Sequence, residues 1–389
     1  MRVLYVNQTA QMSGAEHSLL TLIEGLRDRV DAEMACPEGD FADAARDRGL
    51  PVHVITGTDV NLQLHPVETP KAIAGIVADG RRIAGIGRGG GFDLVHANTT
   101  RAGLIATMFA GAGALPTVVH VRDWTPEGAV SSAILQYTRV RASALICISE
   151  LVAGEFPARP RSTPLHVIHN PIDVQRFDPD RYDRAAARAE LGLGEDEVVA
   201  AVVAQLTPWK GQEDAIRAVA LLAEQHPELR LLVVGSAKFQ TARLDNQAYA
   251  DELHVLPDRL GIADRVRFLG ERRDVPEILR ALDVLLVPSW KEAFGRIVVE
   301  GMAMRLPVVA TDVGGPREIV THGADGLLAA PQDPRAWADA LGRLAADPEQ
   351  RRILGEAGWN TARARFTPAH AADRVAAVYG RLGPRTNGL

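Results

Sequence analysis

Residues 288–328 read PSWKEAFGRIVVEGMAMRLPVVATDVGGPREIVTHGADGLL, a pattern typical of a strand end, a loop, a helix and a second strand. Glu292 falls in the loop after the first apolar run, and Glu300 falls inside the helix that follows. A helix that begins after such a strand presents unpaired backbone N–H groups and the positive end of its dipole, which suits a phosphate. Carboxylates beside it can accept hydrogen bonds from sugar and ribose hydroxyls. The segment therefore predicts a pocket for a nucleotide sugar.

The rest of the chain repeats this alternation of short apolar runs and amphipathic stretches, which is typical of parallel sheets with helical crossovers. The strands expected in the first half are RVLYVN, AEMACP, PVHVI, FDLVHAN, PTVVHV, ALICIS and LHVIHN. Those expected in the second half are EVVAAVVAQ, LRLLVVGS, RVRFLG, DVLLVPS, PVVAT and GLLAA. The fold class that follows is α/β, with doubly wound parallel sheets.

A chain of 389 residues exceeds what one hydrophobic core usually serves, so two domains are expected. We expect an N-terminal domain over residues 1–175 and a C-terminal domain over residues 197–367. The charged, Pro- and Gly-containing segment 176–196 is expected to link them. Residues 368–389 are expected to form a C-terminal helix that packs back on the N-terminal domain. Two such domains would bring the carboxyl ends of both sheets to a shared cleft.

Composition sets the broad class. The chain is 47% hydrophobic and 24% charged, as in ordinary soluble globular proteins. A net charge of −6 argues against a dedicated nucleic-acid binder. Cys36 and Cys147 lie in or beside apolar runs, which predicts buried reduced thiols in a cytoplasmic protein. The chain begins directly with a strand pattern, and no apolar run is long enough to span a bilayer.

Other groups follow predicted strands. Gly14 lies in a loop that leads into an amphipathic helix, where it either approaches a ligand or makes a plain tight turn. His120 ends the run PTVVHV and is followed by Arg122 and Asp123, although a lone histidine there is often satisfied by its neighbours. Lys210 precedes Gly211 at a loop-to-helix junction and could reach a diphosphate as a point charge, or remain a solvated loop lysine.

Some motifs lack the surrounding structure that their usual function requires. Gly85, Gly87 and Gly90 spell GxGxxG, but they precede a strand instead of joining a strand to a helix, so a flexible loop is expected there. The sequence contains no GxSxG, no CxxC and no Walker lysine. Metal and serine-nucleophile chemistries therefore have no support, and no metal ligand is predicted.

Taken together, these motifs resemble the retaining GT-B glycosyltransferases of family 4, the glycosyl transferases group 1. The resemblance is most specific where Glu292 and Glu300 form the E-x7-E pattern within AFGRIVVEGMA, followed by PVVATDVGGPREIV and DGLL, and where AQLTPWKG precedes a helix. It is looser in SGAE, DLVHAN, HVRD and ICISE, and it covers nearly the whole chain. The implied fold is GT-B, with two Rossmann-like domains that face a central cleft.

The resemblance also implies roles for residues that bind the donor. Glu300 would hold the ribose hydroxyls, Glu292 the hydroxyls of the transferred sugar, and Lys210 the diphosphate. The backbone of Phe294, Gly295, Arg296 and Ile297 would meet the sugar and the phosphates. The remaining donor contacts would be a base held by backbone at Leu269 and Gly270, and a distal phosphate near Gly14.

The catalytic set implied by the resemblance is His120, Lys210 and Glu292, with His120 near the reacting carbon of the sugar. The acceptor would meet Asn98, Thr99, Arg122 and Asp123. Acceptors in this family are read by loops that here fall at residues 8–12, 59–69, 98–101 and 124–128.

One position departs from the family pattern. Gln205 stands where the family usually has an arginine. An amide cannot replace a bidentate, permanently charged guanidinium on a diphosphate, so about one charge-assisted contact is missing. Stabilisation of the leaving group would then rest on Lys210, on helix N-termini, or on a cation such as Arg296 or Arg122.

The implied activity is the metal-independent transfer of a hexose from a nucleoside-diphosphate sugar, with retention of configuration. The donor is expected to be a UDP sugar, with GDP and dTDP left open, and no cofactor is expected. A small soluble acceptor is favoured, in secondary-metabolite (aminocyclitol or antibiotic) or cell-surface glycan biosynthesis. Peripheral membrane contact is left open, and nucleic acid is not expected. Two alternatives stay open: a nucleotide-sugar epimerase or hydrolase on the same fold, and a catalytically silent binding protein.

Overall fold

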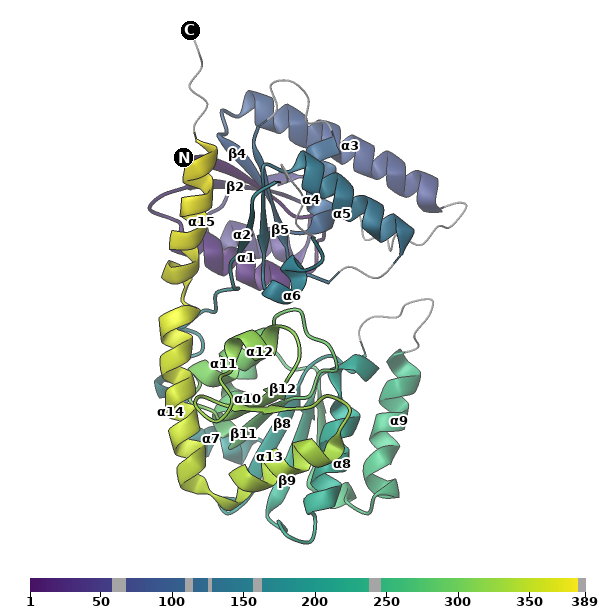
Figure 1. The fold of residues 1–389 in the computed structure, drawn as a ribbon, viewed down its shortest axis with the longest axis vertical. Coiled ribbons are helices and arrows are strands. Elements are labelled where there is room, and N and C mark those ends of the chain that lie inside the picture. Colours follow the sequence, from purple (N-terminus) through teal and green to yellow (C-terminus); the bar gives the residue numbers. More distant parts are fainter. Residues whose placement is uncertain (58–67, 109–114, 125–127, 157–162, 238–245, 384–389) are drawn as a thin grey trace. The chain divides into compact units, whose positions relative to one another are not determined.

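The computed structural model describes the chain except residues 58–67, 109–114, 125–127, 157–162, 238–245 and 384–389 (Figure 1). Most of the acceptor loop expected at residues 59–69, and part of that at 124–128, lie outside the described residues. The chain forms two compact units. Unit 1 comprises Met1–Pro171 and Pro368–Leu389, and unit 2 comprises Ile172–Thr367.

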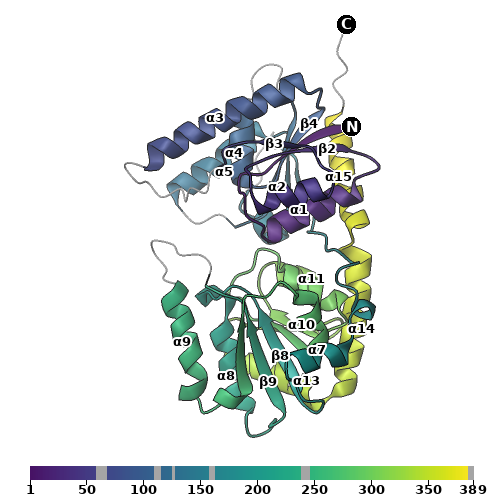
Figure 2. The same ribbon diagram turned by 180° about the vertical axis from the view of Figure 1, so that it is seen from behind.

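Unit 1 contains a seven-stranded parallel sheet in the order β3-β2-β1-β4-β5-β6-β7. Its strands are β1 (Arg2–Val6), β2 (Asp31–Cys36), β3 (Val52–Val54), β4 (Leu94–Ala97), β5 (Thr117–Val121), β6 (Ala144–Cys147) and β7 (Leu165–Val167). Its helices are α1 (Gly14–Gly25), α2 (Asp40–Asp47), α3 (Glu68–Gly89), α4 (Thr100–Met108), α5 (Ala129–Arg141), α6 (Glu150–Ala153) and α15 (Pro368–Leu382). The central strands are apolar on both faces because helices cover both faces of a parallel sheet (Figure 2).

Unit 2 contains a six-stranded parallel sheet in the order β10-β9-β8-β11-β12-β13. Its strands are β8 (Val198–Val203), β9 (Leu229–Val234), β10 (Val266–Gly270), β11 (Val284–Val287), β12 (Val308–Thr311) and β13 (Leu327–Ala329). Its helices are α7 (Arg184–Glu190), α8 (Gln212–Leu222), α9 (Asn246–Arg259), α10 (Val275–Ala281), α11 (Arg296–Ala303), α12 (Gly315–Ile319), α13 (Pro334–Ala346) and α14 (Pro348–Arg365). Both sheets are of the doubly wound α/β type, so the expected fold class is confirmed, and every strand expected from the sequence is present.

The segment 176–196, expected to be a linker, lies within unit 2. It carries the short 3-10 helix η1 (Pro179–Arg181) and α7, which packs against α10. Its buried apolar side chains are few, Phe177 and Leu193 among them, and arginines add to their hold. Arg184 donates to Asp283 Oδ1 at 2.8 Å, and the buried Arg188 donates to Asp283 Oδ2 at 3.2 Å and to the carbonyl of Glu197 at 2.8 Å. The shortage of apolar residues that suggested a linker is thus offset by charged hydrogen bonds.

The prediction of a flexible loop at Gly85, Gly87 and Gly90 is wrong. Gly85 and Gly87 lie inside α3, and Gly90 directly follows its end. Ile83 and Gly87, four residues apart, share the buried face of this helix. The cost of a helical glycine, roughly 1 kcal/mol relative to alanine, is outweighed when the helix packs against the rest of a domain.

After α14 the chain returns to unit 1 as α15, which packs against α1 and carries the ion pair of Asp373 with Arg29 at 2.6 Å. Cys36 and Cys147 are buried free thiols, as expected, and burial raises the pKa of each to about 12. Within the described ranges, no helix has both the length and the apolarity needed to cross a membrane.

Candidate active site

An ion pair joins the loops that follow two neighbouring strands of unit 2. Lys210 ends the short 3-10 helix η2 (Pro208–Lys210) after β8, and Glu292 lies in the loop after β11. Lys210 Nζ lies 2.5 Å from Glu292 Oε2, and the Ser289 hydroxyl donates to the same oxygen at 3.2 Å. The lysine side chain is 26% exposed and the glutamate side chain 15%, so both remain within reach of a ligand.

The approach of these two loops depends on Gly211. This residue has φ +68, and a Cβ built on it would lie 2.0 Å from the carbonyl oxygen of Pro288. The backbone N–H of Trp290 donates to the carbonyl of Trp209 at 2.8 Å, which ties the same loops together. Only glycine fits this position, because any side chain would push the β11 loop away from Lys210.

The helix α11 begins beside the ion pair. Its N-cap is Gly295 with φ +89, and its first residue, Arg296, holds Glu300 one turn later. Arg296 Nη2 and Nε lie 2.7 Å and 3.1 Å from Glu300 Oε1. The Glu300 side chain is 10% exposed. The site therefore contains two carboxylates, each already paired with its own cation.

The β12 loop fixes the start of α11 from the other side. The backbone N–H of Gly315 donates to the carbonyl of Glu292 at 3.0 Å, and a Cβ on Gly315 would lie 2.3 Å from Cα of Phe294. Phe294 is buried and packs edge-on against Phe366, with ring centroids 6.0 Å apart. These contacts make the segment from Glu292 to Gly295 a rigid platform.

Gln205 brings no charge to this platform. Gln205 is exposed in the loop after β8, and its backbone carbonyl accepts a hydrogen bond from Gln212 Nε2 at 2.7 Å. Leu269 and Gly270 end β10, which β9 separates from β8. The carbonyl of Gly270 accepts a hydrogen bond from the backbone N–H of Gly235 at 2.7 Å. Thus the structure brings Lys210 and Glu292 together but leaves Leu269 and Gly270 two strands away from β8.

In unit 1, Gly14 is the first residue of α1, and Ser13 caps the helix. Ser13 accepts a hydrogen bond from the backbone N–H of Ala15, and Glu16 reaches back to the backbone N–H of Ser13 at 3.1 Å. This capping box explains the turn by local chemistry alone.

A buried polar cluster lies where β4 and β5 end. Arg122 Nε donates to Asn98 Oδ1 at 2.6 Å, and Arg122 Nη2 lies 3.3 Å from His120 Nδ1. Thr99 Oγ1 donates to Gln8 Oε1 at 2.6 Å. Burial, and then the charge of Arg122, hold the pKa of His120 well below its usual value. His120 is therefore a neutral imidazole at physiological pH.

Asp123, expected to contact the acceptor substrate, is exposed and directly follows Arg122 of this cluster. Two members of the cluster received no role from the sequence: His96 Nε2 lies 3.2 Å from His120 Nδ1, and Tyr379 OH lies 2.6 Å from His96 Nδ1. His96 could have been found because it stands in an apolar run expected to form a strand, as His120 does. Tyr379 gave no such signal.

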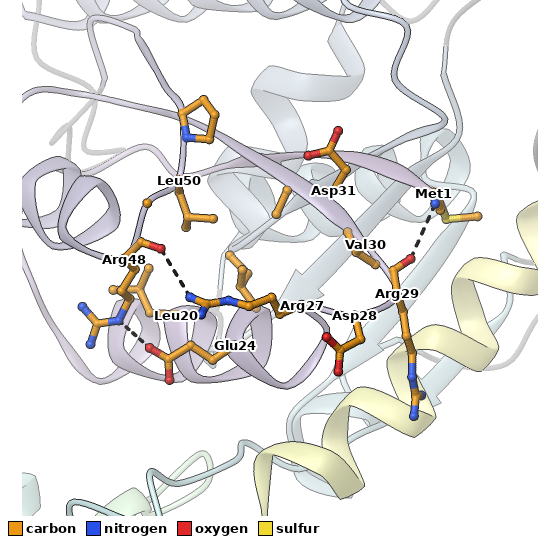
Figure 3. Close-up of a pocket in the computed structure, with 14 residues that line it drawn as sticks. Met1, Leu20, Glu24, Arg27, Asp28, Arg29, Val30, Asp31, Arg48 and Leu50 are labelled. Carbon is orange, nitrogen blue, oxygen red and sulfur yellow. Dashed lines mark hydrogen bonds and ion pairs between the residues drawn. The ribbon is translucent and has the colours of Figure 1, made fainter.

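A surface pocket of about 740 Å³ lies elsewhere, beside α1 and the amino ends of β2 and β3 (Figure 3). Its arginines are already paired: Arg48 Nε donates to Glu24 at 2.7 Å, Arg27 Nη2 donates to the carbonyl of Arg48 at 3.3 Å, and Arg29 pairs with Asp373 at 2.6 Å. No predicted site residue lines it. Ligands of open α/β sheets bind at the opposite, carboxyl ends of the strands.

Both halves of the chain match models of known protein families. The family model described as Glycosyl transferases group 1 matches residues 183–361, and that described as Glycosyltransferase Family 4 matches residues 12–176. A D-inositol 3-phosphate glycosyltransferase of Stackebrandtia nassauensis is 34% identical over 311 residues, which cover 75% of this chain and 68% of that protein. One of Actinosynnema mirum is 30% identical over 97% of this chain and 91% of its own length.

Among solved structures, Anabaena Alr3699/HepE in complex with UDP is similar over 98% of this chain and 100% of its own, with a TM-score of 0.81 and 27% identity. The same protein has also been solved with UDP-glucose, and there the TM-score is 0.78. From the doubly wound sheets, the matched family models and these relatives, we conclude that the chain belongs to the glycosyl transferases group 1, the GT-B glycosyltransferases of family 4.

Proposed function

We propose that this glycosyltransferase moves a hexose from a nucleoside-diphosphate sugar to an acceptor hydroxyl, without a metal ion and with retention of anomeric configuration. The observation that carries the proposal is the pairing of Lys210 with Glu292 at 2.5 Å, directly before the N-terminus of α11. A leaving nucleoside diphosphate needs a cation and backbone donors, and a sugar ring needs hydrogen-bond acceptors for its hydroxyls. The loops after β8 and β11, with the start of α11, supply all of these.

Binding of the donor exchanges partners within the site. Lys210 turns from Glu292 to the diphosphate, and the carboxylate of Glu292 then accepts hydrogen bonds from the sugar hydroxyls. Glu300, one helix turn beyond Arg296, accepts those of the ribose. In the free protein each carboxylate is paired with its own cation, so the donor must displace a cation from each.

Glu292 and Glu300 do not act as the nucleophile and acid of a glycosidase. That chemistry needs two carboxyl groups about 5 to 5.5 Å apart that flank one bond. Here the family resemblance favours attack by the acceptor hydroxyl on the face from which the diphosphate leaves. The acceptor proton passes to the departing phosphate oxygen, and Lys210 with the α11 backbone balances the negative charge that grows there.

UDP is the proposed nucleotide, since HepE has been solved with UDP and with UDP-glucose. The backbone at Leu269 and Gly270 would hold the base. The relatives named D-inositol 3-phosphate glycosyltransferase make a phosphorylated cyclitol the first acceptor to test. In unit 1, Asn98, Thr99 and the exposed Asp123 are proposed to meet it. The buried free thiols support a cytoplasmic location.

The test is the release of nucleoside diphosphate from a panel of nucleotide sugars, with and without acceptors that include inositol 3-phosphate. Acceptor-dependent release with an unchanged anomeric configuration in the product supports the proposal. Release without an acceptor would identify a hydrolase, and interconversion of sugars an epimerase. Absence of turnover alongside tight binding of UDP would identify a silent binding protein.

Two variants separate the proposed roles. Glu300→Ala should weaken binding of bare UDP, because the ribose loses its acceptor. Glu292→Ala should chiefly impair the intact sugar donor. Equal losses for both ligands in both variants would show that the carboxylates are wrongly assigned.

A further inference from the structure

A continuous chain of side-chain hydrogen bonds crosses the core of unit 1. The hydroxyl oxygens of Tyr5 of β1 and Tyr379 of α15 lie 3.2 Å apart, where either hydroxyl can rotate to donate to the other. Tyr379 OH lies 2.6 Å from His96 Nδ1, and His96 Nε2 lies 3.2 Å from His120 Nδ1. All four side chains are at most 1% exposed. These hydrogen bonds thus link α15 to His120, near the carboxyl end of β5.

Such a chain has two proton arrangements. In the first, every hydrogen is donated toward His120, so that His96 donates from Nε2 and His120 keeps its own hydrogen on Nε2. In the second, every hydrogen is donated away from His120, and Nε2 of His120 is a bare acceptor that could take a proton. The two arrangements give this imidazole opposite chemistry.

Arg122 distinguishes the two arrangements. A guanidinium can only donate, and Nη2 of Arg122 lies 3.3 Å from His120 Nδ1. Arg122 is held in that position by Asn98 at 2.6 Å and by Asn170. A hydrogen on His120 Nδ1 would point at another donor, so Nδ1 carries the lone pair and Nε2 carries the hydrogen. The Nε2 atom is buried and has no hydrogen-bond partner among the residues that the structure describes.

We propose that Tyr379 and His96 are positioning residues that hold His120 in its Nε2–H form, so that His120 donates a hydrogen bond to a ligand oxygen and does not accept a proton. Only the identity of that ligand, a sugar donor or its acceptor, rests on the proposed function. The inference gives α15 a role in the reaction, through a hydroxyl 259 residues beyond His120 in the sequence.

The first test is spectroscopic and needs no substrate. Long-range ¹H–¹⁵N correlation on the full chain labelled with ¹⁵N-histidine reports which ring nitrogen carries hydrogen, and His120→Gln assigns the His120 signals. We expect His120 protonated at Nε2 in the unchanged protein. Tyr379→Phe should give a mixture of forms at His96 and His120. Without the Tyr379 hydroxyl, His96 can carry its hydrogen on Nδ1 and accept at Nε2, which competes with the preference that Arg122 imposes on His120 Nδ1.

Tyr5→Phe is the matched control. It removes one phenolic hydroxyl from the same core, but Tyr379 can still donate to His96 without Tyr5, so the histidine signals should stay as in the unchanged protein. In the transfer assay we expect Tyr379→Phe to lower kcat about 10- to 100-fold with little change in KM, by analogy with the loss when the partner that orients a metal-binding histidine is removed. Tyr5→Phe should stay within about threefold, because removing it leaves the orienting bond to the imidazole in place.

A His120 signal protonated at Nδ1 in the unchanged protein would overturn the proposal, because the chain would then run in the other direction. Identical spectra and rates for the two Phe variants would also overturn it. Failure to find any transferase activity would instead refute the proposed function, while the spectra would still decide the form of His120.

Discussion

Replacing Glu292 by glutamine should change nucleotide binding and sugar transfer in opposite directions. In the free protein the Lys210 ammonium is bound to the Glu292 carboxylate at 2.5 Å. In the proposed function, a nucleoside diphosphate draws the lysine away from this partner. Glutamine keeps the size and the hydrogen-bonding oxygen but removes the charge, so Lys210 becomes more available to the diphosphate. Transfer should fall nevertheless, because the amide is a weaker acceptor for the sugar hydroxyls.

The size of the gain follows from the exposure of the pair. Two unit charges about 3 Å apart attract by about 5.5 kcal/mol at an effective dielectric constant of 20 and by about 1.4 kcal/mol in water. Exposed ion pairs contribute about 0.2 to 1 kcal/mol net, and hydrogen bonds to charged groups about 1.5 to 3 kcal/mol. With side chains 26% and 15% exposed, Lys210 and Glu292 fall between these cases. We expect UDP to bind about 1 to 1.5 kcal/mol more tightly, or roughly five- to twelvefold.

Isothermal titration of UDP into Glu292→Gln, Lys210→Met and the double variant measures this coupling. Lys210→Met should weaken UDP binding. Adding Glu292→Gln to the Lys210→Met variant should then have little further effect on UDP binding. The kcat of the Glu292→Gln variant should fall about 100-fold, or roughly 2.7 kcal/mol in the transition state. If Glu292→Gln weakens UDP binding, or if it strengthens binding equally without Lys210, then exchange of the lysine between carboxylate and diphosphate is refuted.

Three further outcomes follow from packing and charge. Gly211→Ala should lower the free energy of unfolding by about 3 kcal/mol in urea titrations, because a left-handed φ and a backbone clash add. Gly261→Ala, with a similar φ of +70 but open space around it, should cost only about 1 kcal/mol. Asp283→Asn should cost about 3 kcal/mol, because it leaves the buried Arg188 short of an anion, and hydrogen exchange should show α7 opening first. Burial and Arg122 lower the folded pKa of His96 and of His120, that of His96 to about 3. The unfolded chain therefore binds more protons below pH 6.5. The free energy of unfolding has its full value above that pH and should fall below it by up to about 1.4 kcal/mol per pH unit for each of these two histidines. His96→Phe should remove one such contribution in urea titrations across pH 7.5 to 5.

The strands could be predicted from the sequence because their signal is local. Val198–Val203 and Val284–Val287 are uninterrupted apolar runs, each preceded by an acidic residue, and a parallel sheet covered on both faces requires such runs. The segment 176–196 could not be placed in this way. Its attachment depends on Arg188 reaching Asp283, 95 residues away, and no periodicity within the segment indicates that contact.

The candidate site shows the same difference between local signals, which the sequence carries, and long-range contacts, which it does not. Lys210 and Glu292 could each be placed at a strand end from the sequence, but their contact depends on β8 lying next to β11, with β9 and β10 on the other side. The chain that reaches His120 was missed for a similar reason. Tyr379 reads as one more apolar residue on a helix face, and only the packing of α15 brings its hydroxyl to His96.

The charge balance of the site gives Gln205 a meaning that the sequence alone did not. Lys210 and Arg296 each hold one carboxylate, so the free site is close to neutral. A third, unpaired cation at position 205 would attract any phosphate-bearing molecule. Without it, an anion gains little unless the carboxylates that it displaces from their cations find new hydrogen-bond donors. A complete nucleotide sugar brings those donors as ribose and hexose hydroxyls, whereas inorganic diphosphate brings none. Under the proposed function, glutamine at this position therefore favours the intact donor over simple phosphates, at the cost of one contact to the leaving group.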